Sequence, residues 1–333
     1  MQIKHRITLA DVAAVAGVSK MTASRALRGA PDVSRENIDK VERAARETGY
    51  VGNPLATAFS NSKSNLIGVV VPSLNNIVFA EVMSGIAQGI EGSGLKPMFG
   101  VTDYDPAKEF ELIKSLLSWN PAGLIVTGLD QSDKTRELLA ASAVPVVQIM
   151  DTDGDALGAA IGFSHFEAGR EMAQALIAQG RRRFGYVGCG LAHDLRAGRR
   201  LEGFKAALEA AGLALVAMRH DPEHSSTEAG RRLTAEILQA HPDLDCVYYS
   251  NDDVALGGVF SCLAQGIAVG DALILAGFNG LEMTRTLPVR IATTITPRRQ
   301  IGFAAGRYLV EAKQGALMRP SHKTVLPTVL SLP

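Results

Sequence analysis

The first pattern of apolar residues in the chain begins at Thr8 and has the period of an α-helix. Thr8 suits the N-cap, and Gly17 can adopt the positive φ that ends a helix at a tight turn. Ser19 can then cap a second helix, so the spacing predicts a helix-turn-helix. One buried face of the first helix, at positions i, i+3, i+4 and i+7, is predicted from Leu9, Val12, Ala13 and Ala16.

The second helix is expected to be apolar on one side and cationic on the other. Ala23 and Leu27, four residues apart, are predicted to face inward. A short cationic helix fits the width of the DNA major groove. A helical hairpin whose charges are merely solvated has the same pattern, so both interpretations stay open at this point. The outer face carries Lys20, Met21, Ser24, Arg25 and Arg28.

A third helix is predicted from Ser34 to Thr48, with Gly49 as its stop and Ile38, Val41 and Ala45 on its buried face. Residues 1–64 contain ten Lys and Arg against six Asp and Glu, a surplus of +4, although the whole chain has a formal net charge of zero. The positive charge is therefore concentrated where contacts with DNA phosphates need it, which favours DNA binding.

Residues 52–64 separate these helices from the rest of the chain. Asn53 as N-cap and Pro54 as the first helical residue would start a short helix. A helix of about two turns is marginal in isolation. On physical grounds alone, these residues favour a plain linker over a helix.

From Leu66 onward, short apolar runs alternate with amphipathic segments. Such alternation predicts parallel sheets covered by helices on both faces. Two halves fit, about 65–163 and 164–292, with 297–333 crossing back and a last strand at Thr324–Val329. The other expected strands are 66–71, 95–101, 123–127, 144–149, 159–163, 183–188, 215–218, 246–250, 273–278 and 291–295. The expected helices include 79–91, 106–117, 166–178, 199–210, 227–239 and 253–265.

Composition narrows the class of protein. A length of 333 residues with 47% hydrophobic and 20% charged residues is ordinary for a globular protein of two or three domains. No run approaches the ~18 apolar residues of a membrane span, and the start MQIKHRITLADV has no apolar signal region. Cys189, Cys246 and Cys262 are far apart and are expected to be reduced core thiols rather than a disulfide or zinc set. We therefore expect a cytoplasmic protein with no membrane partner, no metal and no cofactor.

Three blocks of sequence resemble the LacI family of sugar-responsive repressors: ITLADVAAVAGVSKMTASRALRG, GYVGNPLATAF and LIGVVVPSLNNIVFAEVMSGI. The resemblance covers the whole chain. Within the family it is strongest to the gluconate-utilisation repressors, through VSKMTASR, LLSWNPAGLIVT and YYSNDDVALG.

The resemblance implies an all-α helix-turn-helix DNA-binding headpiece, a hinge helix and an α/β periplasmic-binding-protein-like core of two doubly wound parallel-sheet subdomains. The implied limits are 1–51 for the headpiece, 52–64 for the hinge and 65–333 for the effector-binding and dimerisation core. The N-subdomain is then about 65–163 with 297–323, and the C-subdomain about 164–292 with 324–333. No apolar heptad follows the last strand, so we expect a dimer without a coiled-coil tetramerisation tail.

For DNA binding, the resemblance matches Lys20, Met21 and Arg25 to base-reading positions. Lys20 and Arg25 can donate to guanine, and Met21 offers apolar contact, for instance to a thymine methyl. Ser19, Thr22 and Ser24 are expected to bond phosphates and set the register. In the hinge, Ala56 and Phe59 are expected at the minor groove, with Phe59 where relatives have a leucine wedge. The partner is then a pseudo-palindromic operator read by a homodimer.

For the small molecule, several polar residues follow predicted strands, where ligands bind in open parallel sheets. Each of them alone is equally explained as a turn former or a helix cap, and Asp252 and Asp253 in particular can cap the following helix. The resemblance supports Asp151, Arg200, Asn251 and Asn279. Arg200 can donate two parallel hydrogen bonds to a carboxylate. Asn279 stands where many relatives have an acid, which would repel an anion. The full candidate set is Ser73, Phe79, Asp151, His165, Arg200, Asn251 and Asn279.

These features favour a repressor of sugar-acid catabolism that leaves its operator when gluconate or a close relative binds. The ligand could instead be a ketogluconate, a phosphorylated sugar acid or a neutral sugar. An enzyme is the main rival, but the chain has no Walker loop, GxGxxG after the first strand, GxSxG or HExxH. A solute-binding protein has no use for residues 1–64. We expect no catalytic residues.

Overall fold

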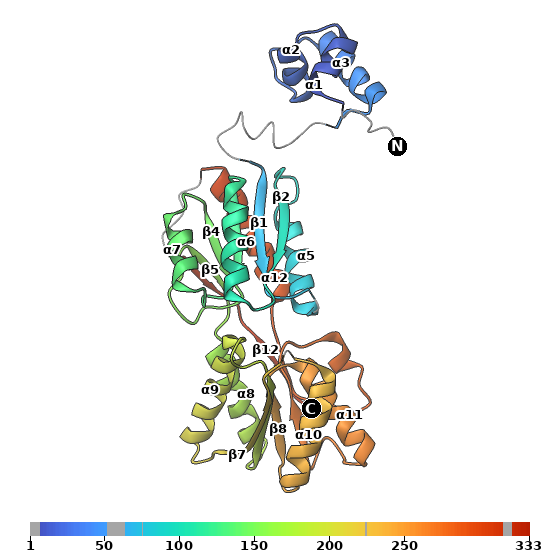
Figure 1. The fold of residues 1–333 in the computed structure, drawn as a ribbon. Coiled ribbons are helices and arrows are strands. Elements are labelled where there is room, and N and C mark those ends of the chain that lie inside the picture. Colours follow the sequence, from blue (N-terminus) through green and yellow to red (C-terminus); the bar gives the residue numbers. More distant parts are fainter. Residues whose placement is uncertain (1–6, 52–63, 75, 224, 316–321) are drawn as a thin grey trace. The chain divides into compact units, whose positions relative to one another are not determined.

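The computed structural model describes residues 7–51, 64–74, 76–223, 225–315 and 322–333. The chain divides into two compact units between Ser64 and Asn65 (Figure 1). The smaller unit is a helical headpiece, and the larger unit is an α/β core with two lobes.

The headpiece contains the three predicted helices, α1 (Leu9–Ala16), α2 (Lys20–Leu27) and α3 (Arg35–Thr48). Thr8, Ser19 and Ser34 cap them, because each side-chain oxygen accepts a hydrogen bond from the backbone N–H three residues further on. Gly17 ends α1 at φ 67° and Gly49 ends α3 at φ 67°. The helix-turn-helix and its caps are therefore confirmed.

The headpiece core is built from small side chains, which let the three helices approach closely. One prediction about it is wrong, because Leu27 is 37% exposed and Ala26 is buried in its place. A buried face can continue after Ala23 at three or at four residues, and α2 uses the three-residue step to Ala26. The buried set is Val12, Ala13, Ala23, Ala26, Val41 and Ala44.

The first lobe of the core is a six-stranded parallel sheet in the order β11-β5-β4-β3-β1-β2. Helices α5 (Ile77–Gly89) and α12 (Arg298–Lys313) pack together on one face, and α6 (Pro106–Ser118) and α7 (Asp133–Ala141) cover the other. The strands are β1 (Leu66–Val71), β2 (Lys96–Val101), β3 (Gly123–Thr127), β4 (Val146–Ile149), β5 (Ala159–Gly162) and β11 (Lys323–Val325).

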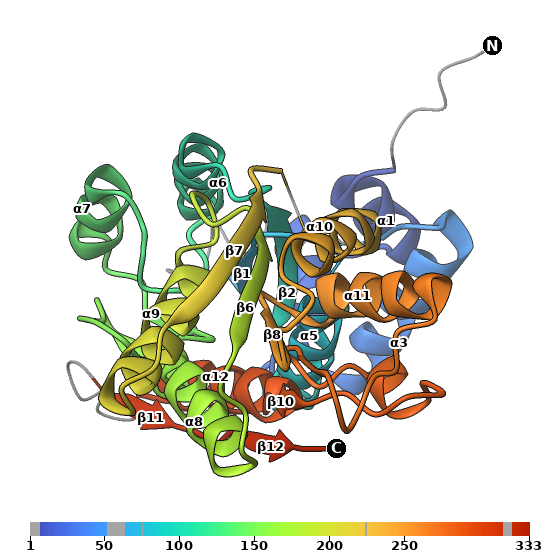
Figure 2. The same cartoon turned by 90° about the horizontal axis from the view of Figure 1, so that it is seen from below.

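The second lobe is a four-stranded parallel sheet in the order β7-β6-β8-β9. Figure 2 shows α8 (His165–Ala178) and α9 (Leu195–Ala210) on one side of it and α10 (Thr227–Ala240) and α11 (Asp252–Gln265) on the other. A short 3-10 helix, η1, spans Glu282–Arg285. The strands are β6 (Phe184–Cys189), β7 (Leu215–Asp221), β8 (Cys246–Tyr249) and β9 (Ile274–Ala276), with β10 (Thr293–Ile295) paired to β12 (Val329–Ser331).

Neighbouring residues of one strand serve opposite faces of each sheet. Val69 of β1 packs in the cluster under α5 and α12, while Val70 packs in the cluster under α6 and α7. In the second lobe, Tyr248 packs towards α8 and α9 and Tyr249 towards α10 and α11. Strands that are apolar on both faces explain the continuous apolar runs in the sequence. The predicted pair of doubly wound parallel sheets is confirmed.

The prediction of a single last strand at Thr324–Val329 is wrong. Lys323–Val325 forms β11 beside β5 of the first lobe, and Val329–Ser331 forms β12 beside β10. Pro327 lies between the two strands and lacks the N–H that a continuous ladder needs. The chain therefore passes between the lobes after Val325, as it also does after β5 and after β10.

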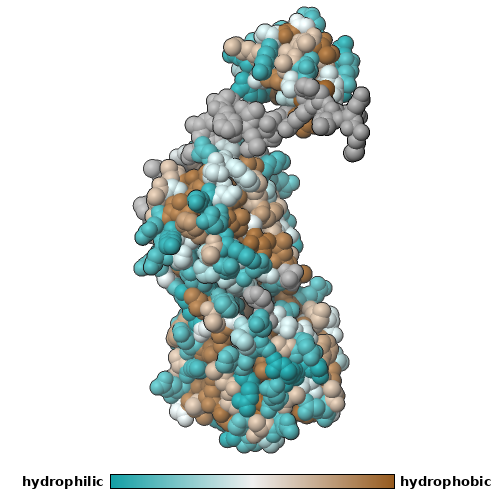
Figure 3. Space-filling model, in the orientation of Figure 1, coloured by the Kyte–Doolittle hydropathy of each residue, from teal (hydrophilic) through white to brown (hydrophobic). Residues whose placement is uncertain are grey.

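Buried and exposed surfaces agree with the composition. The three cysteines are free and buried, as expected of core thiols. The face drawn in Figure 3 mixes hydrophilic and hydrophobic residues on both lobes. Among the described helices, none is long and apolar enough to cross a membrane.

Glycines bring α8 and α9 of the second lobe into close contact. A Cβ added at Gly203 would lie 1.9 Å from the backbone oxygen of Phe166, so we expect Gly203→Ala to push the helices apart and to destabilise the protein by about 1–3 kcal/mol. Gly198→Ala on the same helix is the matched control. A Cβ there meets nothing within 4 Å, so this change should be neutral or stabilising by ~0.5–1 kcal/mol. Chemical denaturation measures both, and equal effects of the two substitutions would contradict the packing argument.

Candidate functional site

The outer face of α2 presents the side chains predicted to bind DNA. Lys20 and Arg25 are exposed, and Met21 is 70% exposed, so all three side chains are accessible to a partner. Arg25 forms an ion pair of 2.5 Å with Asp32 on the connection to α3. The guanidinium is therefore held at the surface of the headpiece rather than in its core.

The smaller polar residues of α2 mostly serve the helix itself. Ser19 accepts a hydrogen bond of 3.0 Å from the N–H of Thr22, and their hydroxyl oxygens lie 2.8 Å apart. Ser24 is half-buried, and its carbonyl accepts a bond from Nε of Arg28. Ala56 and Phe59, the two candidate hinge contacts, lie outside the described residues.

The core contains a cleft between its lobes, at the carboxyl ends of the parallel strands. Six of the seven candidate effector residues line adjoining cavities of this cleft, and Asp151 does not. Ser73 and Asn251 border a cavity of about 260 Å³. A smaller cavity, of about 40 Å³, is lined by Phe79, His165, Arg200, Asn251 and Asn279, together with Tyr104, Asp194 and Arg196.

Arg200 lies on α9 and is 4% exposed. One guanidinium nitrogen, Nη2, donates to the carbonyl of Ser250 at 2.8 Å, and the group lies 4.1 Å over the ring of Phe278. Its Nε is buried with no hydrogen-bond partner. Among the described residues, no carboxylate lies within ion-pair distance of Arg200. A buried cation that faces a cavity and has no ion-pair partner can bind an anion there.

His165 fixes the other side of that guanidinium. Its Nδ1 lies 2.9 Å from Nη1 of Arg200, and its Nε2 lies 2.8 Å from the carbonyl of Met150. An arginine can only donate, so Nδ1 accepts and the proton sits on Nε2, from which it is donated to Met150. Burial, followed by the charge of Arg200, holds the pKa of His165 well below its usual range. The ring is therefore neutral and adds no second charge to the site.

Asn251 and Asn279 contribute neutral amides to the same cavity. Asn251 caps α11, because its side-chain oxygen accepts a bond from the N–H of Val254, and its amide nitrogen donates to Ser225. Asn279 has a φ of 117° and bridges to Ile295 beside it. Asp252 does not cap α11 as the alternative interpretation held. Its carboxylate accepts bonds from the N–H of Leu281 and the hydroxyl of Thr293.

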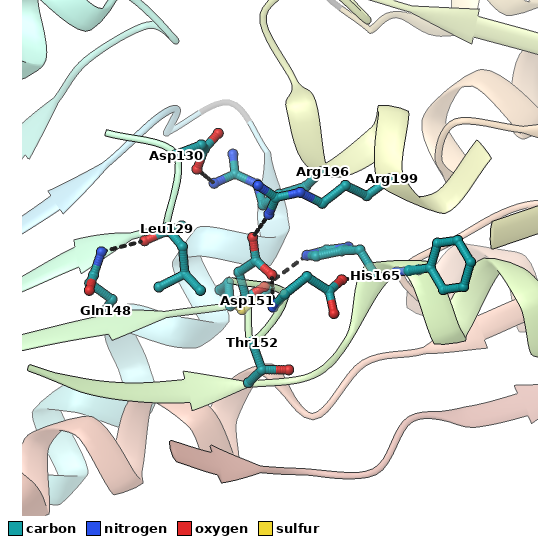
Figure 4. Close-up of polar contacts among 12 residues, drawn as sticks. Leu129, Asp130, Gln148, Asp151, Thr152, His165, Arg196 and Arg199 are labelled. Atoms are coloured by element: carbon teal, nitrogen blue, oxygen red, sulfur yellow. Dashed lines mark hydrogen bonds and ion pairs between the residues drawn. The ribbon is translucent and has the colours of Figure 1, made fainter. Parts of the chain in front are cut away.

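Asp151 is fully buried and is bonded to protein groups. It forms an ion pair with Arg199 of α9 and accepts a hydrogen bond of 2.8 Å from the N–H of Asp153. Figure 4 shows its carboxylate pointing toward Arg199, which lies on the opposite lobe. Burial raises the pKa of Asp151 to about 6, and the bond from Asp153 and the charge of Arg199 offset part of that rise. The geometry favours a contact between the lobes over a contact with a ligand.

We expect Arg199→Ala to destabilise the core by about 2–3 kcal/mol, because it leaves a buried carboxylate without its cation. A buried acid whose pKa is raised on folding lowers the free energy of unfolding. This loss of stability is absent at pH values below the unfolded pKa of 3.8, and it is complete at pH values above the folded pKa. Loss of Arg199 raises the folded pKa further, so the cost should be larger at pH 8 than at pH 5. Denaturation at both pH values measures it. Arg199→Ala with Asp151→Asn should recover most of the loss, and an unchanged deficit in the double variant would disprove the pairing.

The cleft also contains residues that the sequence analysis missed. Arg196 is 8% exposed and lies 3.8 Å from Asp130 and 3.6 Å from Asp194, closest N–O atoms in each case. Tyr104 follows β2 with a φ of 59° and borders the cavities at Ser73 and at Arg200 as well as a third cavity of the cleft. Both had a signal: Arg196 is four residues before Arg200, one turn earlier on the same helical face, and Tyr104 follows a strand end as the other candidates do.

A further cavity of the cleft, of about 130 Å³, has a different lining. Tyr104, Thr127 and Arg196 belong both to this cavity and to the one at Arg200. Its other polar residues are Thr102, Asp105, Glu109, Asp130 and His193. The cleft thus extends from a cationic end to one lined by several carboxyl groups.

A helix-turn-helix headpiece in one chain with a two-lobed core that holds a polar cleft defines a DNA-binding regulator with a site for a small molecule. Comparison with known proteins supports this class. Residues 8–53 match the family model described as bacterial regulatory proteins, lacI family. Residues 64–322 match the periplasmic binding proteins and sugar binding domain of LacI family. The chain belongs to the LacI family of bacterial transcriptional regulators, and the enzyme interpretation is excluded.

Individual relatives agree with this assignment. The HTH-type transcriptional regulator GntR of Pseudomonas aeruginosa is 38% identical over 95% of this chain and 92% of the relative. The crystal structure of a LacI-family regulator from Silicibacter pomeroyi has a TM-score of 0.93 at 41% identity and covers 98% of both chains. The lac repressor dimer bound to operator and the anti-inducer ONPF shares the fold, with a TM-score of 0.84 at 24% identity over 98% of both chains.

Proposed function

We propose that this regulator represses genes of sugar-acid catabolism and leaves its operator when gluconate or a closely related monocarboxylate binds the cleft. The observation that carries the proposal is Arg200, a buried guanidinium that faces the cavity without a carboxylate partner among the described residues. A sugar carboxylate supplies the missing charge and can accept from the free Nε. The identity to relatives named GntR supports the same ligand class.

Neutral groups around Arg200 suit the hydroxyls of such a ligand. The amides of Asn251 and Asn279 offer both donors and acceptors, and neither adds a negative charge that would repel the carboxylate. Ser73 and Phe79 extend the lining towards the first lobe. Asp151 is then a structural residue between the lobes rather than a ligand contact.

On the DNA side, we assign base reading to Lys20, Met21 and Arg25 and phosphate contacts to Ser19, Thr22 and Ser24. The hinge, residues 52–64 with Ala56 and Phe59, is assigned to the minor groove. Two headpieces read a pseudo-palindrome, so the functional unit is a homodimer, as in the operator-bound lac repressor of the same fold. Effector binding and operator binding are linked through the closure of the core.

The test uses the full-length protein and an operator selected from random duplex DNA. Fluorescence anisotropy follows the complex while gluconate or glucose is added at constant ionic strength, because affinity for DNA falls steeply with salt. Gluconate should release the operator and glucose should not. Calorimetry in which glucose binds and gluconate does not would remove the proposal.

A further inference from the structure

The two ends of the cleft differ in charge, and this difference defines the orientation of a ligand. At one end Arg200 contacts neutral groups, namely His165 and the carbonyl of Ser250, and the amides of Asn251 and Asn279 line the same cavity. Asp194 also lines it, but no ion pair joins Asp194 to Arg200 among the described residues. At the other end, beyond the shared Tyr104 and Arg196, lie three carboxyl groups: Asp105, Glu109 and Asp130. A ligand with its carboxylate on Arg200 that extends past Tyr104 and Arg196 places its opposite end beside these acids.

The acidic end is only partly neutralised. Arg196 is shared between Asp130 and Asp194, and both distances, 3.8 and 3.6 Å, are too long for hydrogen bonds. Asp130 has a side chain that is only 16% exposed. Glu109 is half-buried and has no Lys or Arg within 4.0 Å in the part of the chain that the structure describes. Asp105 already caps α6 by accepting hydrogen bonds from the N–H groups of Ala107 and Lys108. These N–H groups at the helix N-terminus are therefore not free to bind a second anion.

Electrostatics at Glu109 agree with this geometry. Burial, and after it the charge of Asp130, raises the pKa of Glu109 to about 7. The charge of Arg196 and a hydrogen bond with Gln131 offset part of this rise in pKa. Burial and the neighbouring acid together disfavour further negative charge at Glu109.

We propose that Glu109 and Asp130 determine specificity by accepting the hydroxyl end of a sugar monocarboxylate and by rejecting ligands that carry a second anionic group at that end, such as a terminal phosphate. The proposal rests on the function proposed above, because it places the first carboxylate on Arg200. A terminal hydroxyl can donate a hydrogen bond to either acid. A phosphate monoester has only acceptors when ionised and a charge of about −1.5 to −2, so two partly buried acids at that end repel it.

The test compares gluconate with 6-phosphogluconate by calorimetry at pH 8, on the full-length protein. The wild type should bind gluconate at least ~10-fold more tightly. Glu109→Gln should increase the affinity for 6-phosphogluconate by about 5- to 10-fold and change the affinity for gluconate by less than about threefold. The preference for gluconate over 6-phosphogluconate should therefore decrease. Asp130→Asn should also decrease the preference for gluconate over 6-phosphogluconate. This second variant keeps the test valid if Glu109→Gln folds poorly.

Glu111→Gln is the matched control. Glu111 lies on the same helix with a side chain that is 69% exposed, outside the cavity lining, so the same change of charge should leave both affinities unaltered. Equal wild-type affinity for the two ligands, or an unchanged ratio in both cleft variants, overturns the role of Glu109 and Asp130 while the function proposed above stands. If the wild type binds neither ligand, both proposals fail.

Discussion

Replacing Arg200 by alanine is expected to abolish the response to gluconate while leaving operator binding in the absence of ligand intact. The guanidinium faces the cavity with an unpaired Nε and no carboxylate partner among the described residues. Each hydrogen bond to a charged group contributes about 1.5–3 kcal/mol. The loss of two such bonds should therefore lower the affinity for gluconate at least ~100-fold. Calorimetry measures the affinity, and anisotropy on the selected operator measures DNA binding with and without ligand.

Arg200→Ala is a usable variant because it leaves no buried carboxylate without a partner. Its neighbours, the ring of Phe278, the neutral His165 and a carbonyl, tolerate the loss better than an acid would. Arg200→Lys keeps the charge and loses the planar fork, so it should bind gluconate with an affinity between those of the wild type and the alanine variant. Gluconate affinity within threefold of the wild type in Arg200→Ala would place the carboxylate elsewhere.

The fold could be predicted from the sequence because its signals are local. Apolar residues on both faces of a strand, caps such as Ser19 and Ser34, and stops such as Gly49 act over a few residues, and the structure uses them as expected. The exceptions depend on tertiary packing. Nothing within α2 distinguishes Ala26 from Leu27 as the buried residue, and only the position of the neighbouring helices decides it.

The candidate site was predictable to the extent that strand ends identify it. Sequence reasoning found His165, Asn251 and Asn279 at strand ends and Arg200 through the family resemblance, and the structure brings all four to one cavity. It missed Arg196 because the helix was expected to begin at residue 199, and α9 begins at Leu195. With the correct start, Arg196 falls on the same face as Arg200, four residues away.

Contacts between residues that are distant in sequence could not be predicted, for a physical reason. Asp151 and Arg199 are 48 residues apart and lie on different lobes. A strand-end aspartate looks the same whether it binds a ligand or an arginine of the opposite lobe, so only the packing of the lobes reveals its role. The same holds for Glu109, which a helix pattern places on an ordinary amphipathic helix.

Replacing Arg25 by alanine is expected to relax the sequence preference for DNA. Arg25 is exposed on α2, with Met21 four residues before it, and pairs with Asp32 at the surface. An arginine that reads guanine contributes about 1–3 kcal/mol of discrimination, so affinity for the preferred operator should fall about 10- to 100-fold while affinity for unrelated duplex changes little. Selection from random duplex DNA with both proteins, followed by titration of the preferred sequence, measures the change.

The salt dependence of binding separates base reading from a phosphate contact of Arg25. If Arg25 bonds a phosphate, its loss weakens all sequences alike and lowers the slope of log affinity against log salt by about one, whereas loss of a base contact leaves that slope nearly unchanged. Arg46→Ala is the matched control, because it removes the same charge from a 72% exposed side chain of α3. It should leave the preferred DNA sequence unaltered.

Asp32→Asn frees Arg25 from its ion pair and should strengthen operator binding. A purely structural role of that ion pair would not have this effect.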